Sequence, residues 1–207
     1  MKNTAPMSLK QLKKPVNNTS PSIKQLFPIQ LYPVNDVQFL LSNGPDMIST
    51  QLRSGQPWEQ ATVQIMQHFL TGLKQPVVLD IGANLGSITI PIAKFIQKNQ
   101  GKVYSFEAQR GVYYQLCGNI FSNSLINICH AFNIAIGNRM TEINIPVLDL
   151  NHEANIGSLS LYDDIRKQQN TLSTTPNLFE KVSMQTIDSL NLLHAAVIKI
   201  DVEGLEL

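Results

Sequence analysis

The chain has 207 residues, of which 43% are hydrophobic and 15% are charged, enough for one globular domain with a core and a tail but scarcely for two full domains. Its formal net charge of +1 provides no broad electrostatic surface for nucleic acid or an anionic membrane, so we expect small or neutral partners and no nucleic acid. Cys117 and Cys129 are the only cysteines, and neither belongs to a metal-ligand or disulfide pattern, so we predict no metal.

The N-terminal residues 1–25 combine lysine, asparagine and proline with few large apolar groups, which predicts a flexible tail. Met1 precedes polar residues instead of an apolar signal core, and no stretch approaches the roughly 18 apolar residues of a membrane span. We therefore expect a cytoplasmic protein with no membrane span.

Residues 26–75 are expected to form a cap beside the main domain. Apolar residues interleaved with prolines over 26–41 indicate short edge strands or an irregular cap, and Asn43-Gly44-Pro45 marks a turn. Apolar residues at three- and four-residue spacing over 57–73 predict an amphipathic helix. Its apolar stripe would consist of Trp58, Ala61, Ile65, Phe69 and Leu73.

Residues 76–207 show a different rhythm, in which apolar strands alternate with helices. We expect strands over 77–79, 102–106, within 126–136 and, as a buried-type strand, over 195–202, with helices over 88–97 and 112–121. This alternation is typical of parallel β-α-β units in an α/β domain. A hairpin or extended strand is expected over 141–150, and the polar residues 151–177 predict a mobile loop.

The strongest motif is Asp80-Ile81-Gly82-Ala83-Asn84-Leu85-Gly86, which follows the first strand of this domain and precedes a helix. Gly82 would allow a tight turn and a close backbone approach to a ligand, and Gly86 would let the helix begin beside it, where free N–H groups favour an anionic group. Asn84 and Ser87 replace two glycines of the dinucleotide fingerprint, so a pyrophosphate fits poorly. The pattern suits an adenosyl amino acid; an ordinary structural glycine turn is the alternative.

Glu107 closes the second strand, 25 residues after Gly82, where a carboxylate can accept hydrogen bonds from both hydroxyls of a ribose. Ala108 and Gln109 follow it and could border an adenine ring. A glutamate at a strand end is often a plain surface residue, but the glycine turn nearby favours the ribose interpretation.

The third motif is Lys199-Ile200-Asp201-Val202-Glu203-Gly204, in the last predicted strand. Side chains alternate along a strand, so Lys199, Asp201 and Glu203 share one face, and the two acids emerge at the carboxyl tip where open α/β sheets bind ligands. Asp201 and Glu203 are therefore the candidate catalytic residues. Lys199 could equally form a partly buried ion pair with Asp201.

Together these motifs resemble the FkbM family of S-adenosylmethionine-dependent methyltransferases, over roughly residues 36–207. The resemblance implies a doubly wound, Rossmann-like class I methyltransferase sheet and transfer of a methyl group to a hydroxyl oxygen of a sugar or small natural product. A full sheet of this class continues past Glu203 with a helix and three strands, so we expect the chain to be truncated after the fourth core strand. The resemblance implies cofactor contacts at Asp80, Gly82, Asn84, Gly86 and Glu107.

Methyl transfer to a hydroxyl requires a group that accepts the hydroxyl proton. We expect Asp201 beside the methyl group, with Glu203 as acceptor ligand or base. Two alternatives stay open: a truncated fragment that binds the cofactor without catalysis, and an NAD-dependent oxidoreductase, which the missing fingerprint glycines disfavour. The exposed edge of the last strand predicts that a second copy in an oligomer, or another partner, covers it.

Overall fold

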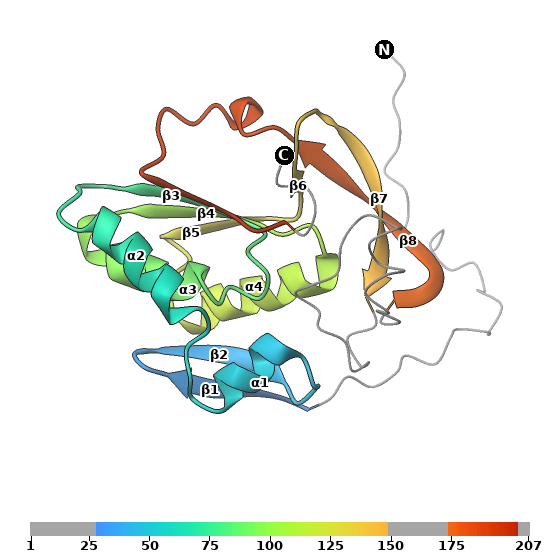
Figure 1. Cartoon of the computed structure of the whole chain (residues 1–207), viewed down its shortest axis with the longest axis horizontal. Coiled ribbons are helices and arrows are strands. Elements are labelled where there is room, and N and C mark those ends of the chain that lie inside the picture. The colour runs from blue at the N-terminus through green and yellow to red at the C-terminus, as the bar shows by residue number, and fades with distance from the viewer. Residues whose placement is uncertain (1–27, 149–173, 203–207) are drawn as a thin grey trace, which may run out of the picture.

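The computed structural model describes residues 28–148 and 174–202. The predicted tail at 1–25, most of the predicted loop at 151–177 and Glu203 lie outside the described residues. Figure 1 shows a central sheet, a layer of helices beneath it, a hairpin beneath the helices, and a second, smaller sheet to one side.

The central sheet has the strand order β5-β4-β3-β9, and each neighbouring pair is parallel. The chain steps from β3 to β4 to β5 in one direction and then places β9 on the other side of β3, so the order reverses between β3 and β9. Such a reversal leaves a crevice at the carboxyl ends of the strands. The predicted α/β fold with a parallel sheet is confirmed. The strands are β3 (Val77–Ile81), β4 (Lys102–Phe106), β5 (Cys129–Phe132) and β9 (Val197–Ile200).

Strand β3 lies at the centre of the sheet and is covered on both faces, which explains its continuous apolar sequence. Val78 packs with the helices below, and Leu79 and Ile81 pack with Phe106 above. The strand continues two residues beyond its predicted end at Leu79, because the charged Asp80 is accommodated inside it, only 1% exposed.

Three helices cover the lower face of the sheet: α2 (Gln60–Leu70), α3 (Thr89–Ile96) and α4 (Arg110–Ser122) (Figure 1). The helices predicted over 88–97 and 112–121 are confirmed as α3 and α4. Helix α2 confirms the helix predicted over 57–73 but is shorter, and its predicted apolar stripe is wrong. Its buried residues are Val63, Met66 and Leu70, whereas Ile65 and Phe69 are 58% and 64% exposed.

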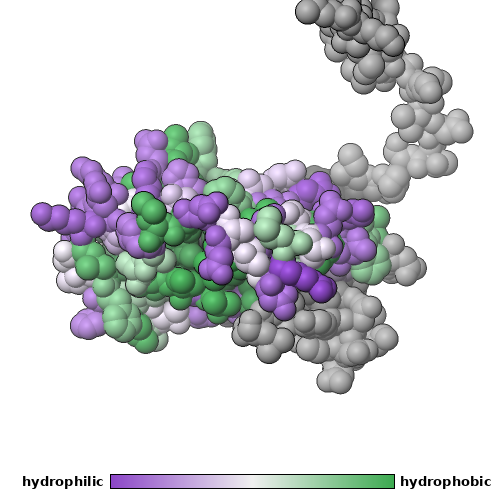
Figure 2. Space-filling model, turned by 90° about the horizontal axis from the view of Figure 1, so that it is seen from above, coloured by the Kyte–Doolittle hydropathy of each residue, from purple (hydrophilic) through white to green (hydrophobic). Residues whose placement is uncertain are grey.

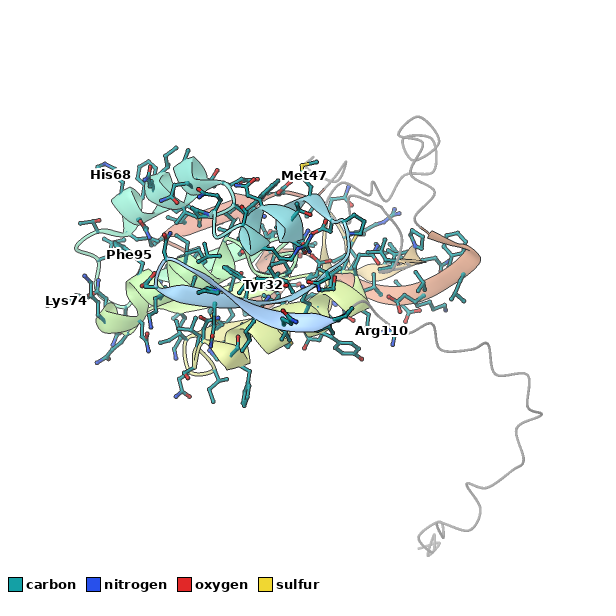
Figure 3. The ribbon with its side chains drawn as sticks, turned by 90° about the horizontal axis from the view of Figure 1, so that it is seen from below. Tyr32, Met47, His68, Lys74, Phe95 and Arg110 are labelled. Carbon is teal, nitrogen blue, oxygen red and sulfur yellow. The ribbon has the colours of Figure 1, made fainter. Side chains whose placement is uncertain are left out.

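The N-terminal hairpin consists of β1 (Ile29–Val34) and β2 (Val37–Ser42), with Asn35 in the left-handed region at its tip. The short strands expected over 26–41 are present, but they pair with each other and not with an edge of the central sheet. The hairpin leads into the short helix α1 (Met47–Arg53), which Asp46 caps by accepting a hydrogen bond from Ser49 N at 2.8 Å. Figure 3 shows the hairpin lying beneath the helices.

Side-chain amides of α4 bond the free edge of β2. Asn119 Oδ1 accepts a hydrogen bond from Leu40 N at 2.5 Å, and Gln115 Nε2 donates to Leu40 O at 2.9 Å. Asn119 Nδ2 also donates to Leu85 O at 2.7 Å, and its side chain is fully buried. Asn119 therefore connects the hairpin to the loop that precedes α3.

The smaller sheet has the order β6-β8-β7 and follows β5 in the chain. Strand β7 (Thr141–Leu148) confirms the extended strand expected over 141–150, and β6 spans Ala135–Ile136. The loop predicted over 151–177 is wrong at its end, because β8 (Thr174–Gln185) already begins at Thr174. The polar sequence of β8 does not show the apolar alternation of a strand, and the strand is stabilised by antiparallel pairing with β7.

The connection from β8 to β9, with its short helix η4 (Asp188–Leu190), passes over the upper face of the central sheet (Figure 1). Strand β9 was expected to be of the buried type, but it is an edge strand whose Ile198 and Ile200 are 45% and 51% exposed. Figure 2 looks down on this side and shows hydrophobic surface among the polar residues. Among the described residues, no helix is long and apolar enough to cross a membrane.

Candidate functional site

The glycine turn after β3 is held between the two neighbouring strands. Gly82, Asn84 and Gly86 have φ values of 73°, 49° and 96°, so the turn depends on left-handed backbone. Gly82 N and Ala83 N donate to Phe106 O at the end of β4, at 3.0 and 2.9 Å. On the other side, a Cβ atom on Gly82 would lie 1.8 Å from the carbonyl oxygen of Asp201. A side chain at position 82 would therefore collide with the backbone after β9, and the close approach of Gly82 to a ligand stays a prediction.

Glu107 points its carboxylate back at this turn. Its Oε2 accepts a hydrogen bond from Asn84 N at 2.9 Å, and its Oε1 accepts one from Gln109 N at 2.7 Å. The residue is 9% exposed. Burial raises the pKa of Glu107 to about 7, although the two amide N–H groups and the more distant Lys199 lower it. Each carboxylate oxygen can still accept a further hydrogen bond from a ligand.

The backbone after Glu107 is fixed by Asn133, which follows β5. Asn133 Nδ2 donates to the carbonyl oxygens of Glu107 and Ala108, each at 2.9 Å. Gln109 Nε2 lies nearby in the sequence and is buried, with no hydrogen-bond partner among the described residues. Asn133 was not a predicted site residue, because its contacts join two strand ends that are far apart in the sequence.

Lys199 and Asp80 form the opposite side of the site. Lys199 Nζ lies 3.2 Å from Asp80 Oδ1 and 3.5 Å from Asp201 Oδ2, and it donates to Gly82 O at 2.8 Å. The ion pair between Lys199 and Asp201, considered from the sequence alone, is confirmed. Asp80 is a further partner of Lys199 that the sequence did not indicate.

Most, but not all, of the predicted site residues lie together in the structure. Six residues meet at the carboxyl ends of β3, β4 and β9, and we call this set the strand-end site: Asp80, Gly82, Asn84, Glu107, Lys199 and Asp201. The side chain of Asp201 is 56% exposed there. Gly86 has a packing role as well, since a Cβ atom on it would lie 2.9 Å from a methyl carbon of Leu116. Glu203 lies outside the described residues.

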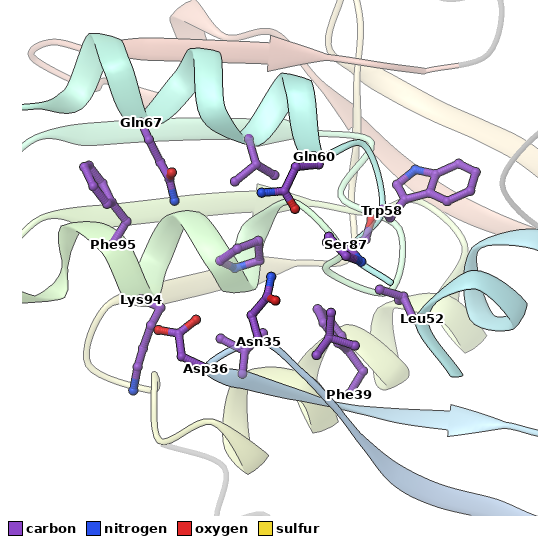
Figure 4. Close-up of a pocket in the computed structure, with 15 residues that line it drawn as sticks. Asn35, Asp36, Phe39, Leu52, Trp58, Gln60, Gln67, Ser87, Lys94 and Phe95 are labelled. Atoms are coloured by element: carbon purple, nitrogen blue, oxygen red, sulfur yellow. The ribbon is translucent and has the colours of Figure 1, made fainter. Parts of the chain in front are cut away.

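A separate cavity of about 150 Å³ lies between the hairpin tip, α2 and α3. Figure 4 shows Gln60 and Gln67 reaching into it from α2, and Asn35 and Asp36 from the hairpin. Ser87 lines it next to the glycine turn, but no residue of the strand-end site does. The sequence could not indicate this cavity, because its lining comes from segments that meet only after folding.

The model of the methyltransferase FkbM domain matches residues 80–207 of the chain. The chain belongs to the FkbM methyltransferase family. The match begins at Asp80, so every residue of the strand-end site lies within the FkbM domain. The parallel sheet is the Rossmann-like sheet that the FkbM resemblance implied. Among the described residues of the FkbM domain and the cap, no group of His, Cys, Asp and Glu could hold a metal ion.

Several solved structures are similar to this FkbM chain. A putative transferase from Pyrococcus horikoshii is 21% identical, over 52% of this chain and 36% of that one, with a TM-score of 0.38. The tRNA m1G37 methyltransferase of M. jannaschii is 16% identical, over 56% of this chain and 36% of that one, with a TM-score of 0.37. TYW2 of M. jannaschii in complex with AdoMet is 18% identical, over 58% and 65% of the two chains, with a TM-score of 0.37.

The FkbM chain therefore spans 36% of the length of the first two of these structures and 65% of the third. No curated protein matches it in sequence.

Proposed function

We propose that the chain is an S-adenosylmethionine-dependent methyltransferase that transfers a methyl group to a hydroxyl oxygen of a sugar or small natural product. The observation on which this rests is the strand-end site, where a glycine turn, a buried acid at the next strand end and an exposed acid at the switch point lie together. Ligands of open α/β sheets bind at this position. The acceptor is proposed to be a small molecule or glycan, without nucleic acid.

The residues present fit the adenosyl part of such a cofactor. Glu107 is a buried carboxylate whose oxygens keep acceptor capacity for the two ribose hydroxyls. Gln109 Nε2 is a buried donor without a partner among the described residues, in the segment expected to border the adenine with Ala108. A buried donor without a hydrogen-bond partner destabilises the folded state, and such donors are uncommon. A hydrogen-bond acceptor on the ligand at this position would remove part of that cost.

The amino-acid part of the cofactor would lie against the turn formed by Gly82, Asn84 and Gly86. Bound S-adenosylmethionine would supply an electrophilic methyl group on a sulfonium. The protein would contribute alignment of the acceptor and exclusion of water. Asp201 is exposed enough to reach an acceptor hydroxyl, and we propose that its carboxylate orients that hydroxyl or accepts its proton. Glu203 remains the second proposed acid.

The cofactor assignment can be tested by calorimetric titration of the purified chain with S-adenosylhomocysteine. We expect saturable binding by the wild type and a loss of at least about tenfold in affinity for Glu107→Ala. Glu142→Ala is the matched control, because Glu142 is an exposed acid on β7, and it should leave the affinity unchanged. Equal affinities of the wild type and Glu107→Ala, or binding of NAD in place of S-adenosylhomocysteine, would contradict the assignment.

The role of Asp201 requires a measurement of turnover with a hydroxyl acceptor. We expect Asp201→Asn to bind S-adenosylhomocysteine as the wild type does and to transfer the methyl group about 10²-fold more slowly. Full turnover by this variant would remove Asp201 from the mechanism. Cofactor binding without methyl transfer to any hydroxyl acceptor, even by the wild type, would favour the alternative that the chain binds the cofactor without catalysis.

A further inference from the structure

The ammonium of Lys199 lies where three parts of the strand-end site meet. It donates to the carbonyl of Gly82 in the glycine turn, and it lies within ion-pair distance of Asp80 in β3 and Asp201 after β9. Lys199 and Asp80 are direct neighbours in the parallel register of β9 and β3. The side chain of Lys199 is 12% exposed and that of Asp80 is 1% exposed. This contact therefore joins β9 to the turn from inside the protein.

Asp80 has a protein group near each of its oxygens. Oδ1 lies 3.2 Å from Lys199 Nζ in an ion pair but has no hydrogen-bond partner among the described residues, and Oδ2 accepts a hydrogen bond from Thr89 Oγ1 at 2.6 Å. Thr89 Oγ1 also lies 2.8 Å from Ser105 Oγ on β4, and both hydroxyl residues are fully buried. A buried carboxylate needs a compensating cation and hydrogen bonds. The family resemblance implied a cofactor contact for Asp80, whereas the groups that lie beside its carboxylate in the structure are Lys199 and Thr89.

The charge of Lys199 is maintained by its neighbours. Burial lowers the pKa of the ammonium, but Asp80 and Asp201, with a smaller effect of Glu59, outweigh burial and raise it above its ordinary value. Lys199 is therefore charged in the folded protein near neutral pH. Its hydrogen bond to the carbonyl of Gly82 is expected to stay unchanged when the pH varies in this range.

We propose that Lys199 is a positioning residue of the cofactor site and that Asp80 balances the charge of Lys199 without contacting the cofactor. The ammonium fixes the carbonyl of Gly82 against the tip of β9, so the turn has one position relative to Asp201. The same turn carries Asn84 N, which bonds the carboxylate of Glu107. Lys199 thereby fixes the distance between the proposed ribose-binding acid and the proposed catalytic acid. This inference rests on the proposed function.

A double-mutant cycle separates positioning from simple stabilisation. Lys199→Met leaves Asp80 as an unpaired buried charge and should lower Tm by roughly 6 °C or more. Lys199→Met combined with Asp80→Asn removes both charges, and the asparagine oxygen can still accept from Thr89, so most of the lost Tm should return. Lys181→Met is the control, because Lys181 is an exposed lysine on β8 that pairs with Glu142 at 3.3 Å.

Two readouts then decide the inference. In the double variant, affinity for S-adenosylhomocysteine should stay about tenfold below that of the wild type, while Asp80→Asn alone stays within about threefold, because it keeps the bond from Lys199 to Gly82. Hydrogen exchange at Ala83 N and Asn84 N should be roughly tenfold faster in the double variant than in the wild type. The exchange measurement needs no ligand.

The outcomes are distinguishable. A double variant that regains both Tm and slow exchange at these amides would show a structural role only and overturn the proposal. A tenfold loss of affinity in Asp80→Asn alone would place Asp80 in direct contact with the cofactor and overturn the second half of the proposal. A wild-type chain that binds no S-adenosylhomocysteine would contradict the proposed function, and hydrogen exchange would still decide whether Lys199 fixes the turn.

Discussion

The strand-end site holds two buried carboxylates, and they are compensated in different ways. Asp80, inside β3, has the ammonium of Lys199 at 3.2 Å and the hydroxyl of Thr89 at 2.6 Å. Glu107, just after β4, receives only two backbone N–H groups and forms no ion pair with any described residue. Burial accordingly raises the pKa of Glu107 to about 7. On one side of the glycine turn the acid Asp80 is paired with Lys199, and on the other side the acid Glu107 has no cation paired with it among the described residues.

This difference indicates which acid is available to a ligand. Both oxygens of Asp80 are buried beside Lys199 and Thr89, so a ligand would have to displace protein groups to reach them. Glu107 lacks the hydration of a surface carboxylate, and hydroxyl donors from a ligand would replace part of it. We therefore propose the ribose contact for Glu107 and the pairing with the positioning residue Lys199 for Asp80, although the two acids lie at the ends of adjacent strands.

The largest expected effect comes from the glycine between the two acids. Gly82→Ala places a Cβ atom 1.8 Å from the carbonyl oxygen of Asp201, so β9 or the turn must move. We expect a loss of more than about 3 kcal/mol in the free energy of unfolding, together with loss of S-adenosylhomocysteine binding. Chemical denaturation and calorimetry measure both.

Gly55→Ala is the matched control for this substitution. Gly55 has a φ of 79°, close to the 73° of Gly82, but nothing lies within 4 Å of a Cβ atom built on it. Its replacement should cost only the backbone strain of about 1–2 kcal/mol. Equal losses in the two variants would mean that positive φ alone, and not contact with β9, explains the glycine at position 82.

The next largest effect is the pH dependence caused by Glu107. Its pKa is about 7 in the folded protein against the ordinary value of 4.5 for a glutamate, so the folded state binds more protons than the unfolded state between these values. Stability should therefore fall as pH rises through this window, by up to about 3 kcal/mol, and level off above pH 7. Urea denaturation of the wild type and Glu107→Gln across this range measures the difference.

The comparison with Glu107→Gln removes the contributions of other titrating groups, which are common to both proteins. A wild-type curve parallel to that of the variant would contradict the raised pKa. Ligand hydroxyls favour the ionised carboxylate, so affinity for S-adenosylhomocysteine should rise with pH through about 7 in the wild type. The variant should show no such rise.

The sequence predicted the residues at strand ends and missed the contacts between elements. Gly82 and Glu107 could be recognised because a short apolar strand followed by a glycine turn or an acid has a local signature. Asn119 and Asn133 could not, since each bonds backbone atoms of segments that lie elsewhere in the chain. The burial of Asp80 was equally hidden, because its partners Thr89 and Lys199 come from α3 and β9.

Periodicity failed where tertiary packing decided which face is buried. The residues of α2 admit two apolar stripes, and the sheet selects Val63, Met66 and Leu70 over the stripe that contains Ile65 and Phe69. Strand β8 was missed for a different reason: its sequence is largely polar, and among its residues with described burial the buried ones are Val182 and Met184. Apart from β8, element type followed from local sequence, whereas orientation required the packing partner.

The smallest effect is expected from an ion pair with ideal distance but little burial. Arg110 Nε lies 2.7 Å from Glu180 Oε2 and joins the start of α4 to β8, with side chains 54% and 19% exposed; Figure 3 labels Arg110. Water and salt screen such a pair, so Arg110→Ala should lower the free energy of unfolding by less than about 1 kcal/mol, and less still at high salt. Lys199→Met should lower the free energy of unfolding several times more, although the ion pairs of Lys199 are longer. The substitution leaves the buried carboxylate of Asp80 without a cation and out of reach of water. Similar losses in the two variants, measured by urea denaturation in the same buffer, would mean that pair distance and not burial sets the value of these contacts.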